Sequence, residues 1–110
     1  MIFDREDNIT IVLQDNASLR TFIENLNSAY KDLKNDHIIL NLFSFAKLRS
    51  DDLLEFLQLS NTHRASGKSF ILVTGKVSYD EVPDEICVVP TIQEARDVIE
   101  MEEIERDLEL

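Results

Sequence analysis

The residues of this sequence that could do chemistry are two neighbouring carboxylates and two histidines. Asp51 and Asp52 are adjacent, and a carboxylate pair can serve in acid–base catalysis or hold a cation. His37 stands at the start of an apolar run, and His63 precedes Arg64 late in a predicted helix. Neither histidine belongs to an H-x-x-x-H, H-x-H or C-x-x-C pattern, so no metal site is expected. We interpret the histidines as structural and the carboxylates as partners of a helix dipole.

Patterns for phosphate binding and covalent catalysis are also missing from the sequence. Gly67 and Gly75 are each followed by a lysine but lack the upstream glycine of a phosphate-binding loop. No serine stands in a G-x-S-x-G elbow, and the single cysteine, Cys87, lies in an apolar run that indicates packing. The sequence therefore assigns no catalytic residue and no cofactor. An enzyme would need unrecognised chemistry around the carboxylate pair and His63.

Charge narrows the class of partner. The 110 residues include 22 acidic and 11 basic side chains, which give a formal net charge of −11. A surface this negative repels phosphate backbones and anionic lipids, so we expect no nucleic acid and no membrane as partner. The sequence shows no signal peptide and no apolar run of ~18 residues. We expect one domain, residues 1–110, that is cytoplasmic and binds a protein.

Apolar runs separated by turn residues predict the strands of one sheet. The strands are predicted at 2–3, 9–13, 37–42, 69–73 and 86–89. The first two are expected to pair as a hairpin, with Ile9, Ile11 and Leu13 on one face of the second strand. The continuous apolar runs of the third and fourth strands predict coverage on both faces.

Helices are predicted between these strands. A cluster at 15–18 starts the first helix, and an apolar stripe at helical spacing continues to Leu33. Ser50 is the expected N-cap of a second helix that ends before Gly67. Residues 74–85 are expected to form a loop or a single turn, and Thr91 opens the last helix with a capping box. This order predicts an α/β fold: a single, mainly parallel sheet of four or five strands with helices packed on it.

Two apolar sets lie on nearly opposite sides of the last predicted helix. They are Ile92, Ala95, Val98 and Ile99 on one side and Met101, Ile104 and Leu108 on the other. A straight helix cannot lay both sets on one sheet, so either it kinks near Glu100 or the second set faces something else. The end of the helix could fray over a neighbouring loop. Alternatively, residues 101–110 form a partner-docking or dimer-forming ridge rimmed by Glu102, Glu103 and Glu105.

The segment from Ile38 to Val73 resembles the anti-sigma factor antagonist, or STAS, domain. Its apolar strand, short loop and helix start, Arg49-Ser50-Asp51-Asp52-Leu53, follow the family's D-S-S-G-L-like signature. The run from His63 to Val73 is similar to the family's helix-Gly-Lys-strand passage. The resemblance implies a STAS-like fold with an N-terminal hairpin. The helix that typical members have before the last strand is replaced here by a short segment that contains Pro83.

The resemblance also implies a switch residue. Regulatory STAS members are phosphorylated on a serine at the start of this helix, and that serine matches Asp51. The preceding serine matches Ser50, the family's Asp matches Arg49 and its Gly matches Asp52. A carboxylate at Asp51 resembles a permanent phosphate mimic. Either the kinase switch is lost, which we favour because Ser50 is expected to cap the helix, or Ser50 has become the acceptor.

Two functional hypotheses follow. The resemblance implies a non-catalytic regulatory module that binds a protein, either an anti-sigma-type regulator or an enzyme. Its partner-binding residues are then expected to be Phe43, Phe45, Lys47, Arg49, Ser50, Asp51 and Asp52. The alternative is an accessory or scaffold subunit that docks on an enzyme or a larger assembly through its acidic C-terminal helix. Its contacts are then Met101, Ile104 and Leu108, and a homodimer through them is a further alternative.

Overall fold

A computed structural model describes residues 1–14 and 17–109 and places them around one five-stranded sheet in the order β1-β2-β3-β4-β5. The strands are β1 (Ile2–Glu6), β2 (Ile9–Leu13), β3 (His37–Asn41), β4 (Phe70–Val73) and β5 (Cys87–Val89). The helices are α1 (Leu19–Leu33), α2 (Ser50–Leu53), α3 (Leu57–Ala65) and α4 (Ile92–Leu108), with 3₁₀ turns η1 (Leu54–Phe56) and η2 (Tyr79–Glu81). β1 and β2 are antiparallel and the other neighbouring pairs are parallel, which confirms the predicted α/β fold.

The N-terminal hairpin forms the β1 edge of the sheet. It turns at Asp7, whose φ of 53° is a left-handed conformation that aspartate tolerates in tight turns. Every residue of β1 is exposed, and its charged side chains suit an unpaired edge strand. In β2, the face with Ile9, Ile11 and Leu13 is only half-buried, because the deeply buried residues are Thr10 and Val12 on the opposite face.

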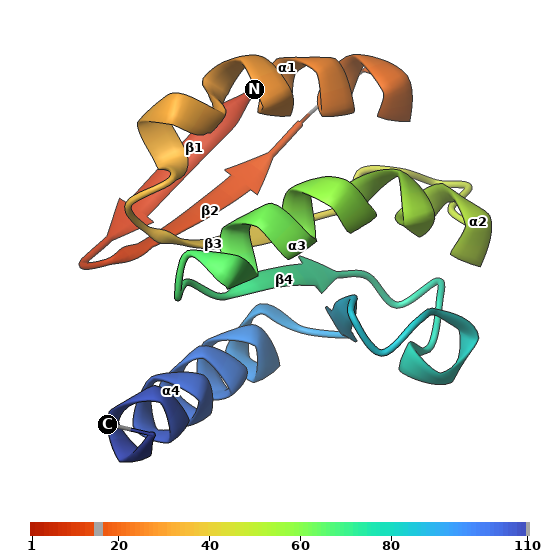
Figure 1. Cartoon of the computed structure of the whole chain (residues 1–110). Helices are drawn as coiled ribbons and strands as arrows, with labels where there is room; N and C mark the ends of the chain where they lie inside the picture. Colours follow the sequence, from red (N-terminus) through yellow and green to blue (C-terminus); the bar gives the residue numbers. More distant parts are fainter. Residues whose placement is uncertain (15–16, 110) are drawn as a thin grey trace.

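The connections between the parallel strands gather on one face of the sheet. Right-handed crossovers that all step in the same direction have no other choice. Figure 1 shows α1 and the α2–η1–α3 run on this face, and the η2 segment packs into the same core through Val77 and Val82. α4 follows the last strand and returns along the opposite face, where it contacts β3, β4 and β5. α4 packs mainly on β3, β4 and β5 and reaches β1 through the Arg96–Glu6 ion pair, so the faces of β1 and β2 on this side stay more exposed.

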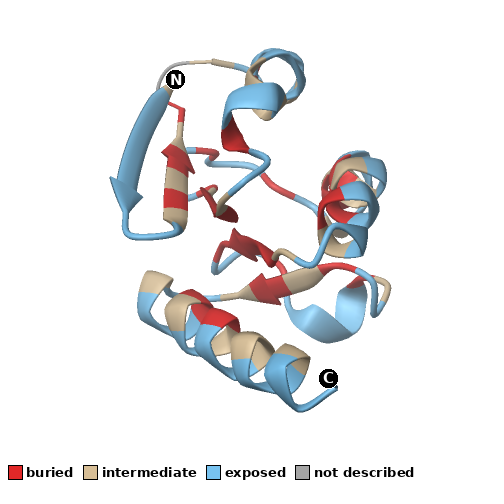
Figure 2. Ribbon diagram, turned by 60° about the vertical axis from the view of Figure 1, so that its left-hand side comes forward, coloured by how far each residue is buried: buried red, intermediate tan, exposed pale blue. Residues whose placement is uncertain are grey.

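Alternation along the central strands divides the core into two layers. Ile38, Leu40, Phe70 and Leu72 face α1 and α3, whereas Ile39, Ile71 and Val73 face α4. All seven side chains are at most 1% exposed. The prediction that continuous apolar runs are covered on both faces is therefore confirmed, and Figure 2 shows the buried residues concentrated in these strands.

The helix boundaries follow local capping. The hydroxyl of Ser18 accepts the N–H of Thr21 at 3.1 Å and so caps α1, whereas Asp15 and Asn16 of the predicted start lie outside the described residues. The helix predicted after residue 50 is interrupted by the η1 turn, yet its buried side continues through Leu53, Phe56 and His63. Its end at Gly67, with a φ of 88°, is the expected left-handed stop.

α4 is one uninterrupted helix. The hydroxyl of Thr91 accepts the N–H of Glu94 at 3.0 Å at its start, and the helix continues to Leu108 without a kink (Figure 1). The alternative of a kink near Glu100 is therefore wrong. Met101, Ile104 and Leu108 are 61%, 55% and 80% exposed, and we call these three residues the C-terminal ridge.

Candidate functional site

The loop between β3 and α2 stands at the carboxyl end of the parallel strands, where α/β sheets commonly place their binding sites. The side-chain oxygen of Asn41 accepts the N–H of Phe43 at 3.1 Å, which turns the chain as it leaves β3. The hydroxyl of Ser44 donates to the carbonyl of Gln14, just beyond β2. The loop is thus held by hydrogen bonds to two neighbouring strand ends, and the side chains that it presents have defined positions.

The two phenylalanines of this loop have different roles. Phe45 is 9% exposed, and its ring lies against that of Phe22 in α1, with centroids 5.6 Å apart. Phe43 is 54% exposed. The expectation that Phe45 contacts a partner is corrected here: the side chain is part of the hydrophobic core and anchors the loop. Phe43 is the phenylalanine of this loop that a partner can reach.

The start of α2 differs from the sequence prediction. The helix begins at Ser50, so Arg49 is the N-cap residue, and its N–H donates to Oδ2 of Asp52 at 2.9 Å. The prediction that Ser50 caps the helix is wrong, because Ser50 is already helical and the carboxylate of Asp52 instead accepts the N–H of the N-cap residue from the first turn. Ser50 is the first helical residue and is half-buried.

The remaining predicted residues form an exposed, charged rim. Lys47, Arg49 and Asp51 are all exposed. The guanidinium of Arg49 lies 4.0 Å from the carboxylate of Asp51, and the two side chains are 82% and 80% exposed. An ion pair this open to water contributes at most about 1 kcal/mol, so either side chain can exchange it for a partner at little cost.

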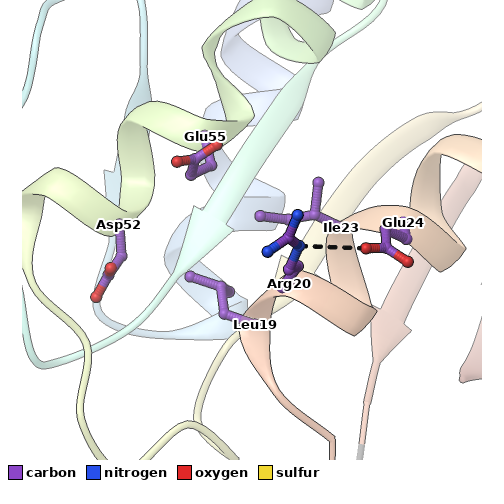
Figure 3. A pocket seen from close by; sticks show the side chains of 6 residues that line it. All are labelled: Leu19, Arg20, Ile23, Glu24, Asp52 and Glu55. Carbon is purple, nitrogen blue, oxygen red and sulfur yellow. Dashed lines mark ion pairs between the residues drawn. The ribbon is translucent and has the colours of Figure 1, made fainter.

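A groove separates this helix start from α1. It has a volume of about 650 Å³ and is lined by Leu19, Arg20, Ile23 and Glu24 of α1 and by Asp52 and Glu55 of the facing helical run. In Figure 3 the two carboxylates of Asp52 and Glu55 lie along one wall, and the apolar side chains of Leu19 and Ile23 lie along the other. Arg20 forms an exposed ion pair with Glu24 at 3.5 Å. The groove is open to solvent and joins apolar surface to acidic groups.

Both histidines are buried and paired, as expected for structural residues. Nε2 of His63 lies 2.8 Å from the carbonyl of Asp36, so it is the donor, and Nδ1 accepts the hydroxyl of Tyr30 at 2.8 Å. Nδ1 of His37 accepts the N–H of Ser69 at 2.9 Å. These contacts lie at the amino end of the parallel strands, whereas the Asp51–Asp52 pair lies beyond their carboxyl ends. The structure therefore does not bring His63 to the carboxylates.

The free energy of unfolding is expected to fall between pH 7.5 and pH 5.5. Burial is the main cause that lowers the pKa of both His37 and His63 below the usual 6.5. The unfolded chain therefore takes up protons that the folded chain does not, so this stability is complete about one pH unit above 6.5 and is lost progressively as the pH falls through it. Urea unfolding at several pH values measures this. His63→Gln should reduce the slope, and an unchanged slope would contradict the assignment. Carboxylates protonate mostly below this range, so relief of their repulsion does not mask the effect.

Sequence analysis missed a polar contact beneath the second half of α4. Glu102 accepts the hydroxyl of Ser69 at 2.6 Å and pairs with Arg64 at 2.8 Å and with Arg106 at 3.7 Å. The next residue, Glu103, accepts Nε2 of His37 at 2.9 Å. The expectation that Glu102 and Glu103 rim the C-terminal ridge is therefore wrong, because both carboxylates turn toward the sheet.

The pKa of Glu102 reports the strength of this contact. Burial alone would raise the pKa of its carboxyl, but hydrogen bonds from Ser69 and Arg64 and the charges of Arg64 and Arg106 outweigh it, so the pKa is lowered. The carboxylate therefore stays ionised in a half-buried position. The polar signal in the sequence was present, since Glu102, Glu103 and Arg106 fall on the same side of the helix as Ala95 and Ile99.

The residues that the structure describes form neither a metal site nor a membrane-spanning helix. In residues 1–14 and 17–109, no group of three or more His, Cys, Asp or Glu side chains is arranged to hold a metal ion. Within the same residues, no helix combines the length and the apolar character needed to cross a membrane.

Comparisons with known proteins agree on the fold. No protein-family model and no curated protein matches the sequence. The structure is similar to that of a serine-to-glutamate variant of RsbS from Moorella thermoacetica, with a TM-score of 0.63 and 12% identity over 90% of this chain and 93% of that chain. It is also similar to the NMR structure of the protein TM1081, with a TM-score of 0.63 and 18% identity over 89% of this chain and 86% of that chain. The chain therefore has the STAS-like fold that its element order and its Ile38–Val73 segment predicted.

Proposed function

We propose that this chain is a non-catalytic regulatory module of the cytoplasm that binds a protein through the β3–α2 loop and the start of α2. The observation that carries the proposal is that one loop and the helix start after it expose an aromatic ring, Phe43, and three charged side chains, Lys47, Arg49 and Asp51. Exposed aromatic and arginine side chains are typical anchors of protein interfaces. We define these four residues as the loop surface.

The STAS-like fold supports the same surface. In the resemblance, the phosphorylated serine of regulatory members corresponds to Asp51, which is 80% exposed here. A carboxylate at this position carries a permanent negative charge, so we propose that the module binds its partner without a kinase switch. Because Arg49 is the N-cap residue, Ser50 has no capping role that would exclude it as a phosphate acceptor. Asp51 alone therefore supports the loss of the switch.

Substitutions at the loop surface should weaken partner binding. Phe43→Ala removes an exposed ring, and Asp51→Arg reverses a charge that a complementary partner would contact, so each should weaken binding at least about tenfold. The tagged protein and its variants would be used as bait in a lysate of the source cells. The proteins recovered would be identified by mass spectrometry, and their affinity for purified bait would then be measured by titration calorimetry.

Matched controls separate this surface from general effects of charge or aromatic area. Tyr79→Ala removes a ring that is 77% exposed, and Asp80→Arg makes the same charge change on the η2 turn. Both controls should bind as the unmodified protein does. If Phe43→Ala and Asp51→Arg bind as well as the controls, the loop surface is not the binding site. Ser50→Ala should also leave binding unchanged, because the proposed module needs no phosphate on Ser50. Weaker binding of this variant would instead implicate Ser50 as the phosphate acceptor.

A second candidate function is that of an accessory subunit that docks on an enzyme or a larger assembly through α4. The exposed C-terminal ridge supports it. The loop surface and the ridge lie on opposite sides of the sheet, so the two functions can be tested independently.

A further inference from the structure

We propose that the outward face of α4 binds an amphipathic helix of a partner protein whose apolar seam is flanked by lysine or arginine. The face consists of the C-terminal ridge and the acidic side chains beside it. Figure 2 shows this side of α4 exposed along its length, with buried and half-buried residues only toward the sheet.

The second half of α4 is amphipathic in the reverse sense. Glu102, Glu103 and Arg106 are the side chains that it turns toward the sheet, where they contact Ser69 and His37. Met101 and Ile104 point to solvent. Rotating the helix to bury the ridge would break the contacts of Glu102 with Arg64 and Ser69 and that of Glu103 with His37, so the exposure of the ridge is fixed by specific contacts. Neighbouring apolar residues held on the exposed side of a helix mark an interaction surface.

Spacing gives the shape of the cover. Met101, Ile104 and Leu108 are separated by three and four residues, which is the a–d–a spacing of a coiled-coil seam. The positions that flank this seam are Glu100, Glu105 and Asp107, and all three are exposed. A partner helix that lays its own apolar seam on the ridge therefore meets carboxylates on both sides.

Charge excludes a second copy of this chain as the preferred cover. Two ridges packed together would place acidic flanks opposite acidic flanks in either orientation, in a protein with a net charge of −11. The basic residues of α4 do not relieve this. Arg106 turns toward Glu102 and Ser69, and Arg96 pairs with Glu6 of β1. Lysine or arginine on the partner would instead make favourable pairs across the seam.

Designed peptides test this proposal with the protein as it exists. Three fluorescent helical peptides would be titrated into the full chain: one with leucine at a and d and lysine at e and g, one with glutamate at e and g, and one with the lysine composition scrambled. Anisotropy should show the lysine peptide binding at least about tenfold more tightly than the other two, since only it offers both the seam and the charge. Equal binding of the scrambled peptide would overturn the proposal, because charge alone would then explain it.

Variants locate the site. Ile104→Ser with Leu108→Ser should weaken the lysine peptide at least about tenfold, and Glu100→Lys with Glu105→Lys should transfer preference to the glutamate peptide. Asp80→Lys with Asp84→Lys makes the same change in net charge elsewhere and should bind the lysine peptide about as the unmodified protein does. Loss of binding in this control, or a dimer seen by sedimentation and removed by the ridge variants, would overturn the proposal. Asp51→Arg should also bind this peptide normally, so failure of the loop surface and of the ridge are distinguishable.

Discussion

Replacing Phe45 by alanine is expected to lower the free energy of unfolding by about 3 kcal/mol. The side chain is 9% exposed and packs against Phe22, whose ring also contacts Phe56 at a centroid distance of 6.2 Å. Removing the ring leaves a cavity between α1 and the loop that the surrounding helices fill only in part. Equilibrium unfolding in urea, followed by circular dichroism, measures the change.

Phe43→Ala is the matched control for this prediction, since it removes the same ring two residues earlier in the same loop. Phe43 is 54% exposed, so its loss should change the free energy of unfolding by less than about 0.5 kcal/mol. Phe45→Ala should thus act on stability, and Phe43→Ala on binding. Equal destabilisation by the two variants would contradict the assignment of Phe45 to the core.

Replacing Glu102 by alanine is expected to lower the free energy of unfolding by about 2 kcal/mol, because it leaves the half-buried guanidiniums of Arg64 and Arg106 without their carboxylate. The figure lies below that for a fully buried pair because the two arginines are 33% and 29% exposed. Hydrogen exchange should also accelerate in the second half of α4. Without Glu102 this half loses its contacts with Arg64 and Ser69, and the apolar residues on its other side face water and do not hold it.

Glu105→Ala on the same helix is the control, because Glu105 is exposed and flanks the ridge. Its stability should stay within about 0.5 kcal/mol of the unmodified protein. If Glu102→Ala is no more destabilising than Glu105→Ala, the polar contact does not hold α4 in its rotation. The outward orientation of the ridge would then not be fixed by Glu102.

The central strands β3 and β4 were predictable because their own residues indicate that they are buried. The apolar runs at Ile38–Leu42 and Ser69–Val73 leave few alternatives for residues that must be covered on both sides. Given the strand order β2-β3-β4, the right-handed crossover rule then places α1 and α3 on one face. The choice between a kinked and a straight α4 was different, because it depended on what lies beneath residues 102–106. Two of those partners, Ser69 and Arg64, are 33 and 38 residues away from Glu102 in the sequence.

The sequence predicted where the candidate loop lies but not which of its side chains are exposed. The loop and the start of α2 lie where the resemblance placed them, yet Phe43 and Phe45 have the same side chain and differ only in direction. Direction depends on how the loop is held by Gln14 and Phe22, which no local pattern encodes. The cap of α2 could have been found, since an Asp three residues after Arg49 is a known way to satisfy the first N–H groups of a helix.

Hydrogen–deuterium exchange of the complex would show whether the loop surface binds a protein. The partner recovered by affinity capture would be added in excess to the full chain, and exchange would be followed by mass spectrometry with and without it. If the partner binds the loop surface, peptides covering residues 42–54 become protected, whereas the β1–β2 hairpin and the η2 turn exchange as before. Protection confined to the hairpin or to the η2 turn, with residues 42–54 unchanged, would show that the partner binds elsewhere.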